Sequence, residues 1–335
     1  MIRGMLLSRL MLVLPTLFGV AVVVFVLLRV VPGDPIAMMI PPGASAADID
    51  RLRALYGLDR SIAAQFGLWL SGVAGGDFGR SISLRQDVLG LVLGRLPATL
   101  ELAGLAALAA VAAGAALALA GAYLRSTPGE WLIDAVVAVA LGIPDFLWGL
   151  LFILVFAVLA PVLPVSGRID PGMATGFSTN FYLIESIATG RWTVAGGLLR
   201  HAVLPAAALA LPFAAIVARV LKASLAETEQ QDYALMARAR GFTRRRILLV
   251  EALPNAAIPT VALAGVQVTF LLGGTVLVER IFSYEGIGNM AIDAVINRDL
   301  PLIQGLVLTF ALLFIALNLV VDIVVALLNP RLRRG

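Results

Sequence analysis

Residues 231–241 of this chain read QDYALMARARG, and Leu253-Pro254 follows twelve residues after the glycine. They lie within 219–259, the only long, strongly basic and helix-prone insertion in an otherwise apolar chain. We predict a helix over 231–240 that Gly241 ends, because glycine readily adopts the left-handed conformation of a helix C-cap. At ~1.5 Å per residue this helix would be ~15 Å long, a length that fits a cleft on a soluble partner.

The composition places this insertion in an integral membrane protein. Of 335 residues, 60% are hydrophobic and 14% are charged, and the mean hydropathy is +0.98, which a soluble domain could not solvate. We predict an all-α protein with six transmembrane helices, because six apolar segments reach the roughly 20 residues needed to cross a bilayer. These segments are 10–28, 97–123, 131–160, 203–220, 256–278 and 302–327.

The distribution of charge predicts the orientation in the membrane. Arg and Lys are about twice as dense in both termini and in loops 124–130 and 219–255 as in the opposite loops, so we place the former segments in the cytoplasm. Both ends of the chain are therefore inside. The predicted organisation is an N-terminal segment with the first transmembrane helix over 1–30, a long external loop over 31–95, and a five-helix transmembrane core over 96–330 that contains the cytoplasmic loop 221–255.

The external loop contains two predicted surface helices. Ser45 and Asp48 have the spacing of a capping box, which opens a short helix. A second helix is indicated by apolar residues at helical spacing, namely Ile62, Phe66, Trp69 and Leu70. We expect both helices to lie on the outer surface of the membrane, where they cover the mouth of the bundle, meet a partner, or pack at the interface.

Several kinds of catalytic site are excluded by residue counts. The chain has no cysteine, and therefore no disulfide and no cysteine-bound zinc. Its sole lysine, Lys222, follows Leu221, so a phosphate-binding G-x-x-x-x-G-K-[ST] loop is absent. A zinc-binding H-E-x-x-H motif needs two histidines and is excluded, because the chain has only His201. We expect His201 at the outer surface. The basic pI of about 9.9 is explained by membrane orientation rather than by nucleic acid. We expect no catalytic residue, metal or cofactor in this chain.

Polar residues within the spans are candidates for a translocation path, since burying them in a membrane is costly. Asp145 follows Pro144 near the middle of the third span, where proline permits a kink, and Gln267 and Thr269 lie in the fifth. An alternative is that Asp145 pairs with another subunit or reaches water at the kink. For Gln267 and Thr269 the small residues nearby favour close helix packing over a place on the path. We interpret Glu101, Asn318 and Asp322 as inter-helix or interface polar groups.

Short motifs occur in order between these spans. They are PGDP at 32–35, GLD at 57–59, GDFGRS at 76–81, RLPATLEL at 95–102, LPVSGR at 163–168, QDY at 231–233, ARARG at 237–241, NRD at 297–299 and NPR at 329–331. With them the chain resembles, over nearly its whole length, the first-permease branch of the dipeptide/oligopeptide (also nickel and glutathione) class of ATP-binding-cassette (ABC) importers.

The signature of that family reads E-A-A-x3-G-x9-I-x-L-P. Ala237, Gly241 and Leu253-Pro254 fit its spacing, whereas the chain departs from it at Leu235, Met236 and Glu251. The peptide-transport branch often lacks the signature glutamate, so these departures are typical of the branch.

The resemblance implies a type I ABC importer fold in a bacterial cytoplasmic membrane. It implies that helix 231–240 couples the spans to a separate ATPase, through Glu227, Asp232, Tyr233, Ala237, Arg238, Arg240 and Gly241. The implied partners are a second, homologous permease in a heterodimer, one or two ATPase subunits that bind ATP and magnesium, a periplasmic or lipid-anchored solute-binding protein, and membrane lipid. No nucleic acid is implied.

The function expected from the resemblance is import of di- or oligopeptides by alternating access. The same architecture would also serve glutathione, nickel or another small solute. A stand-alone secondary transporter would show inverted repeats, and we find none that is convincing. An intramembrane serine protease would need a serine with a histidine partner, but G-x-S-x-G is absent.

Overall fold

The computed structural model describes residues 2–30, 45–55, 59–170, 172–173 and 176–328. The motifs at 32–35 and 329–331, and Gly57-Leu58, lie outside these residues. Described residues form helices and no strands, which confirms the predicted all-α class. The helices are α1 (Ile2–Val30), α2 (Ala46–Leu55), α3 (Ile62–Ala74), α4 (Val88–Tyr123), α5 (Pro128–Gly142), α6 (Asp145–Ile153), η1 (Leu154–Leu159), α7 (Tyr182–Ala188), α8 (Trp192–Thr228), α9 (Asp232–Ala239), α10 (Arg244–Arg246), η2 (Ile247–Ala252), α11 (Leu253–Ile281), α12 (Ile287–Ile296) and α13 (Leu300–Leu328).

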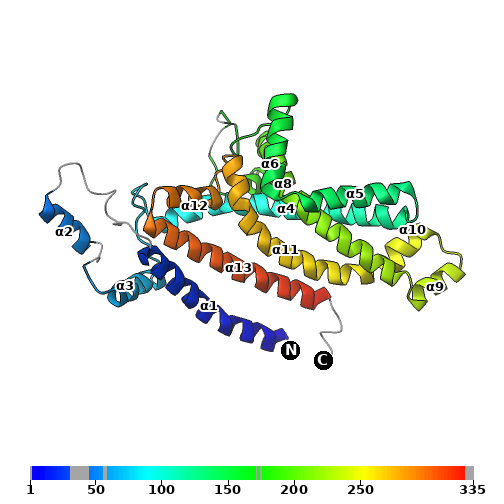
Figure 1. The fold of residues 1–335 in the computed structure, drawn as a ribbon, viewed down its shortest axis with the longest axis horizontal. Helices are drawn as coiled ribbons and strands as arrows, with labels where there is room; N and C mark the ends of the chain where they lie inside the picture. The colour runs from blue at the N-terminus through cyan, green and yellow to red at the C-terminus, as the bar shows by residue number, and fades with distance from the viewer. Residues whose placement is uncertain (1, 31–44, 56–58, 171, 174–175, 329–335) are drawn as a thin grey trace.

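Six spans can be assigned among the described residues. Five single helices are long and apolar enough to cross a membrane, and α5 with α6–η1 forms a sixth, bent span. The predicted segments are found, but most helices extend beyond them; the fourth begins at Trp192 instead of residue 203. The start of α1 and the end of α13 lie near each other, and both point toward the end of the molecule that carries α9 (Figure 1). This arrangement agrees with both termini lying on one side.

The third span is not the single helix predicted over 131–160. It is bent by 101° between Gly142 and Asp145, so that α6 leaves the direction of α5 sharply (Figure 1). Ile143 is extended, at φ −107° and ψ 122°, because the ring of the following Pro144 disfavours helical backbone in the preceding residue. Proline also lacks the N–H that a continuous helix would use. The kink predicted at Pro144 is therefore a complete break.

Helix α8 is the centre of the bundle. It contacts α4, α5, α6, α7 and α11, and the α4–α8 pair forms its largest contact. The two backbones approach closely at Gly114, where an added Cβ would lie 2.6 Å from the carbonyl oxygen of Ala214. Fully buried alanines, Ala106 and Ala110 among them, continue this interface along α4. Small residues let helices pack closely where no water drives their association.

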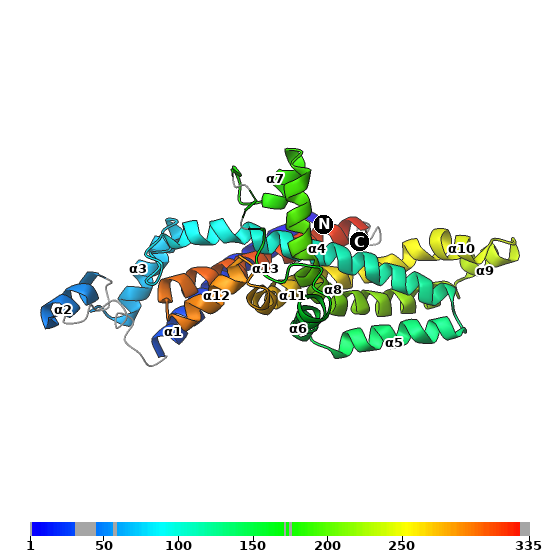
Figure 2. The ribbon, with the colours of Figure 1, turned by 90° about the horizontal axis from the view of Figure 1, so that it is seen from above.

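The two external helices form as predicted. Asp48 accepts hydrogen bonds from the Ser45 backbone N–H (3.1 Å) and hydroxyl (2.7 Å), and its own N–H donates to the Ser45 hydroxyl, which is a reciprocal capping box at α2. The second helix, α3, packs on α1 through the Phe66 ring, 5.2 Å from the ring of Phe25. Figure 2 shows α2 at the end of the molecule opposite α9.

Helix packing at Gly114 gives a first prediction. We expect Gly114→Ala to lower the free energy of unfolding by roughly 1–3 kcal/mol, because the new methyl group overpacks the α4–α8 contact. Gly104→Ala on the same helix is the control, since its added Cβ would meet nothing within 4 Å. It should be neutral or up to about 1 kcal/mol stabilising. Unfolding of both variants in detergent measures this, and equal stabilities would contradict the close approach.

Candidate functional site

Helix α9 stands where the sequence predicts it, at the far end of the bundle (Figure 1). It begins after Gln231 and ends at Ala239, while α8 ends just before Glu229. The chain then returns through Arg244 into one continuous apolar helix that runs to Ile281. Helix α9 is thus connected on both sides to membrane-spanning helices, so a displacement of α9 acts on both.

The end of α9 is a glycine cap. Gly241 has φ +78°, its N–H donates to the Arg238 carbonyl (2.9 Å), and the Phe242 N–H donates to the Ala237 carbonyl (3.2 Å). These two bonds are the pattern of a Schellman motif, which satisfies the last carbonyls of a helix. A Cβ at Gly241 would meet nothing within 4 Å. The backbone conformation alone therefore favours glycine, as the sequence analysis expected.

The two faces of α9 differ in burial. Ala234 and Ala237 are buried and form a small cluster with Ile247 of η2 and Phe242. The opposite side is exposed and partly apolar, and it consists of Tyr233, Leu235 and Met236. The two signature departures at Leu235 and Met236 therefore lie on the exposed side. Of the other predicted residues, Asp232, Arg238 and Arg240 are also exposed.

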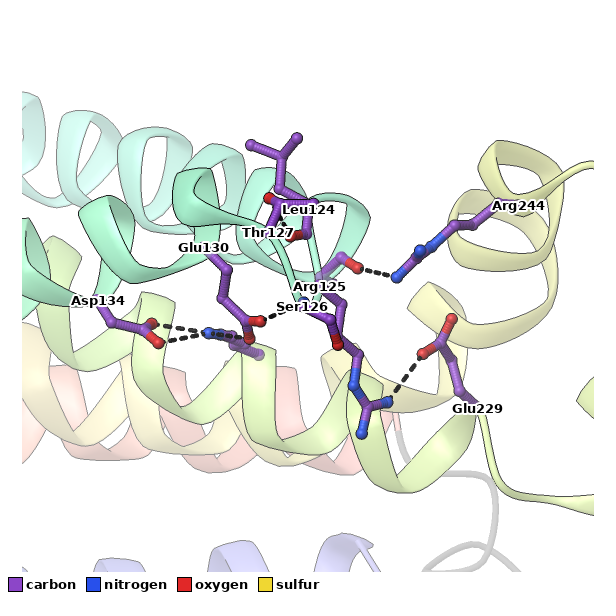
Figure 3. A network of polar contacts seen from close by, with 10 residues as sticks. Leu124, Arg125, Ser126, Thr127, Glu130, Asp134, Glu229 and Arg244 are labelled. Carbon is purple, nitrogen blue, oxygen red and sulfur yellow. Dashed lines mark hydrogen bonds and ion pairs between the residues drawn. The ribbon is translucent and has the colours of Figure 1, made fainter.

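A neighbouring glutamate was missed by the sequence analysis. Glu229, whose side chain is 5% exposed, lies 3.7 Å from Arg125 and 3.5 Å from Arg238 (Figure 3 shows Glu229 with Arg125). The predicted Glu227 is instead exposed, with no ion pair among the described residues. The sequence could not show which of the two glutamates forms ion pairs, because the arginine partners, Arg125 and Arg238, come from other elements.

The polar residues of the spans separate into two groups. Asp145 is the first residue of α6 and lies against α11, where a Cβ on Gly274 would be 2.5 Å from its Oδ2. Gln267 is two turns before Gly274, on the same face of α11. Thr269 is buried and donates to the carbonyl of Gly265 in its own helix (3.2 Å). The structure thus places Asp145 and Gln267 toward one face and turns Thr269 to another.

A buried ion pair connects α4 to the loop between η1 and α7. Glu101 of α4 lies 2.7 Å from Arg168, and both side chains are almost fully buried. Its other carboxylate oxygen accepts from the N–H groups of Leu183 and Ile184 in α7, at 3.0 and 3.1 Å. The motifs at 95–102 and 163–168 therefore meet in space, and Glu101 has the inter-element role that the sequence predicted.

A second buried carboxylate anchors α12, a helix that the sequence analysis missed. Glu279 of α11 accepts from the Thr99 hydroxyl (2.6 Å) and from the Asn289 N–H (3.0 Å). The Thr99 hydroxyl oxygen also accepts from the Ile287 N–H (2.9 Å) at the start of α12. The apolar residues that α12 buries have helical spacing, which could have revealed it; they are Ile287, Met290 and Ala294.

The third buried carboxylate joins two of the motifs. Asp299 accepts from the hydroxyls of Ser81 (2.6 Å) and Ser83 (2.7 Å) and from the Ser83 N–H (2.9 Å). Burial raises the pKa of Asp299, but these hydrogen bonds outweigh it and hold the pKa below its usual value. Motifs 76–81 and 297–299 thus form one junction at the start of α13.

His201 does not precede the fourth span as expected. It lies within α8 and is buried, with Nδ1 2.9 Å from the Gly197 carbonyl oxygen. The expectation was wrong because α8 begins eleven residues before the predicted fourth span, so that His201 is enclosed by the helix and its neighbours.

Comparisons with known proteins cover nearly all of this chain. The family described as binding-protein-dependent transport system inner membrane component matches residues 107–334, and the N-terminal family of the same systems matches 1–103. The di/tripeptide transport system permease protein DppB of Pseudomonas aeruginosa is 37% identical over 97% of both chains. The dipeptide transport system permease protein DppB of Escherichia coli K12 is 36% identical over 98% of both.

Two further similarities are more distant. A putative peptide transport system permease protein of Brucella melitensis is 32% identical over 99% of both chains. A crystal structure of an amino acid ABC transporter with histidines aligns with a TM-score of 0.49 at 18% identity, covering 70% of this chain and 92% of that chain.

Proposed function

Because this chain belongs to the family of binding-protein-dependent transport system inner membrane components, it is a membrane permease subunit rather than an enzyme, and we propose that it imports di- or oligopeptides. The observation that carries the substrate class is full-length similarity to two dipeptide or tripeptide permeases, at 36–37% identity. Glutathione, nickel and other small solutes fit the same architecture and are the alternative substrates. The family implies a solute-binding protein and an ATPase as partners.

The coupling element of this proposal is α9. Its exposed apolar side, made by Tyr233, Leu235 and Met236, docks into the partner ATPase, which binds ATP and magnesium. Asp232, Arg238 and Arg240 make charged contacts at the rim of that interface. Ala237 and Gly241 hold α9 on the bundle through the buried cluster and the cap, while Glu227 on the last turn of α8 adds an exposed charge.

Transport follows by alternating access. Nucleotide closes the ATPase dimer, α9 moves with it, and the spans change from inward-facing to outward-facing. Nucleotide can shift this equilibrium only to the extent that its affinity for one arrangement exceeds its affinity for the other. The solute passes between this subunit and a second, homologous permease, and the loaded binding protein docks on the outer loops.

Asp145 and Gln267 are the residues that we place on the translocation path. Asp145 stands at the only break between helices of one span among the described residues, and Gln267 shares the face of α11 that Asp145 approaches. A carboxylate there attracts the ammonium group of a peptide or a cationic side chain. Thr269, whose hydroxyl bonds within α11, contributes to packing in this proposal.

Co-purification tests the assembly. We expect the tagged chain, solubilised from its native host, to bring down a second six-span permease and a P-loop ATPase, identified by mass spectrometry. Reconstituted with the neighbouring solute-binding protein, this complex should take up labelled dipeptides only with ATP. Recovery of the chain alone, as a stable homo-oligomer, would contradict the importer assignment, and uptake of another solute instead would contradict peptides.

The cap of α9 gives a prediction about coupling. Gly241→Val should lower solute-stimulated ATPase activity roughly 5- to 30-fold, since an ordinary residue in left-handed backbone costs about 1–2 kcal/mol. Membrane insertion should be unchanged. Gly241→Asn is the matched control, because asparagine tolerates this conformation and the site has room for a side chain. Unchanged stimulation in Gly241→Val would argue against a coupling role for α9.

The charge at the break gives a prediction about selectivity. Asp145→Asn should slow import of a lysine-containing dipeptide roughly fivefold relative to an uncharged one, because a charge pair in a water-filled site is worth about 1 kcal/mol. Competition between the two labelled peptides in proteoliposomes measures this ratio. Asp293→Asn, which removes an exposed carboxylate of α12, is the control. An identical ratio in Asp145→Asn and the unchanged protein would remove Asp145 from the path.

A further inference from the structure

The turn between α4 and α5 is a closed and well-defined structure (Figure 3). Ser126 has φ +66°, and its N–H donates to Glu130 Oε2 (2.7 Å). The Thr127 hydroxyl donates to the Leu124 carbonyl (2.6 Å). Because its own side chains fix the turn, a force on any part of it moves the adjoining ends of both helices together.

Two basic side chains, Lys222 of α8 and Arg244 of α10, contact the α4–α5 turn and the helix ends beside it. Arg244 donates to the carbonyl of Ala122 at 2.7 Å, and so satisfies one of the free carbonyls at the end of α4. Lys222 lies 2.8 Å from Glu130 and 2.7 Å from Asp134, both on α5. Glu130 therefore bonds at once to the backbone of the turn and to α8.

The third connection runs through Glu229. Its Oε2 faces Arg125 in the turn at 3.7 Å, and its Oε1 faces Arg238 in α9 at 3.5 Å. Exposed ion pairs contribute little, but this carboxylate is 5% exposed, and a buried charge needs compensation from its partners. Both arginines are about half-exposed, so they can be replaced without leaving a cavity.

We propose that Glu229 is a positioning residue that makes α9 and the α4–α5 turn move as one body. This inference rests on the proposed coupling role of α9. The chain itself connects α9 only to α8 and, through α10 and η2, to α11; no peptide link joins it to α4 or α5. Beside the Arg244 contact with the end of α4, Glu229 makes the ion-pair connection from α9 to the turn, through which a displacement of α9 also reaches α5 and, at the far end of α5, the break that carries Asp145.

Replacement of Arg125 tests the connection in the assembled complex. We expect Arg125→Gln to leave assembly and basal ATPase activity intact but to lower the peptide transported per ATP hydrolysed at least about threefold. Arg125→Lys should restore it, because the charge returns. Arg245→Gln is the matched control, as Arg245 is exposed and has no ion pair among the described residues. An Arg125→Gln ratio equal to that of Arg245→Gln would overturn the proposal.

A distance measurement separates movement from simple stabilisation. The chain has no cysteine, so spin labels can be introduced at Trp131→Cys on α5 and Ala239→Cys on α9, both exposed, in a complex with cysteine-free partners. The distance between the labels should be the same in the nucleotide-free and ATP-trapped complexes, and should change or broaden in Arg125→Gln. A different distance in the two states of the unmodified complex would overturn the proposal.

The two proposals fail in different ways. If Gly241→Val keeps its solute-stimulated ATPase activity, α9 is not the coupling element and the proposed function needs revision. If Gly241→Val uncouples the complex while Arg125→Gln does not, α9 couples without help from Glu229 and only this inference is wrong.

Discussion

Burial of charge in an apolar environment is the constraint on which this structure depends. Lipid offers no hydrogen bonds, so backbone and side-chain polar groups must be satisfied within the protein. The buried carboxylates accordingly gather near the ends of the bundle, and each has partners: Glu101 with Arg168, Glu279 with Thr99, Asp299 with Ser81, and Glu229 with two arginines. Apart from Glu229 with Arg238, these pairings join elements that are distant in sequence, so the groups that are costly to bury also hold the loops in place.

Between these ends the bundle is held by close packing of small side chains. Helix α8 lies against α4 with almost no intervening side chain at Gly114, and this packing continues near its end, where Leu221 and Leu225 are buried. A helix packed in this way behaves as a rigid element. Whatever moves its cytoplasmic end, including the adjoining α9, moves a helix that contacts most of the bundle.

The third span departs from this regularity, and the departure has a local cause. Pro144 forces Ile143 into extended backbone, and the span bends by 101°. Directly after the bend lies a half-buried carboxylate, Asp145, the first residue of α6. The bend also divides the span into α5, which Lys222 ties to α8, and α6, which lies against α8 and α11.

Features that depend on local chemistry were determined by the sequence alone. Hydropathy identified the spans, the capping box at Ser45 identified α2, and the need for left-handed backbone at Gly241 identified the end of α9. Only the tertiary structure decided the charge pairings, such as Glu229 with Arg125 and Arg238, and the buried position of His201. Contacts such as Thr99 with Glu279 join residues 180 positions apart, and no local periodicity encodes which partner will fold against them.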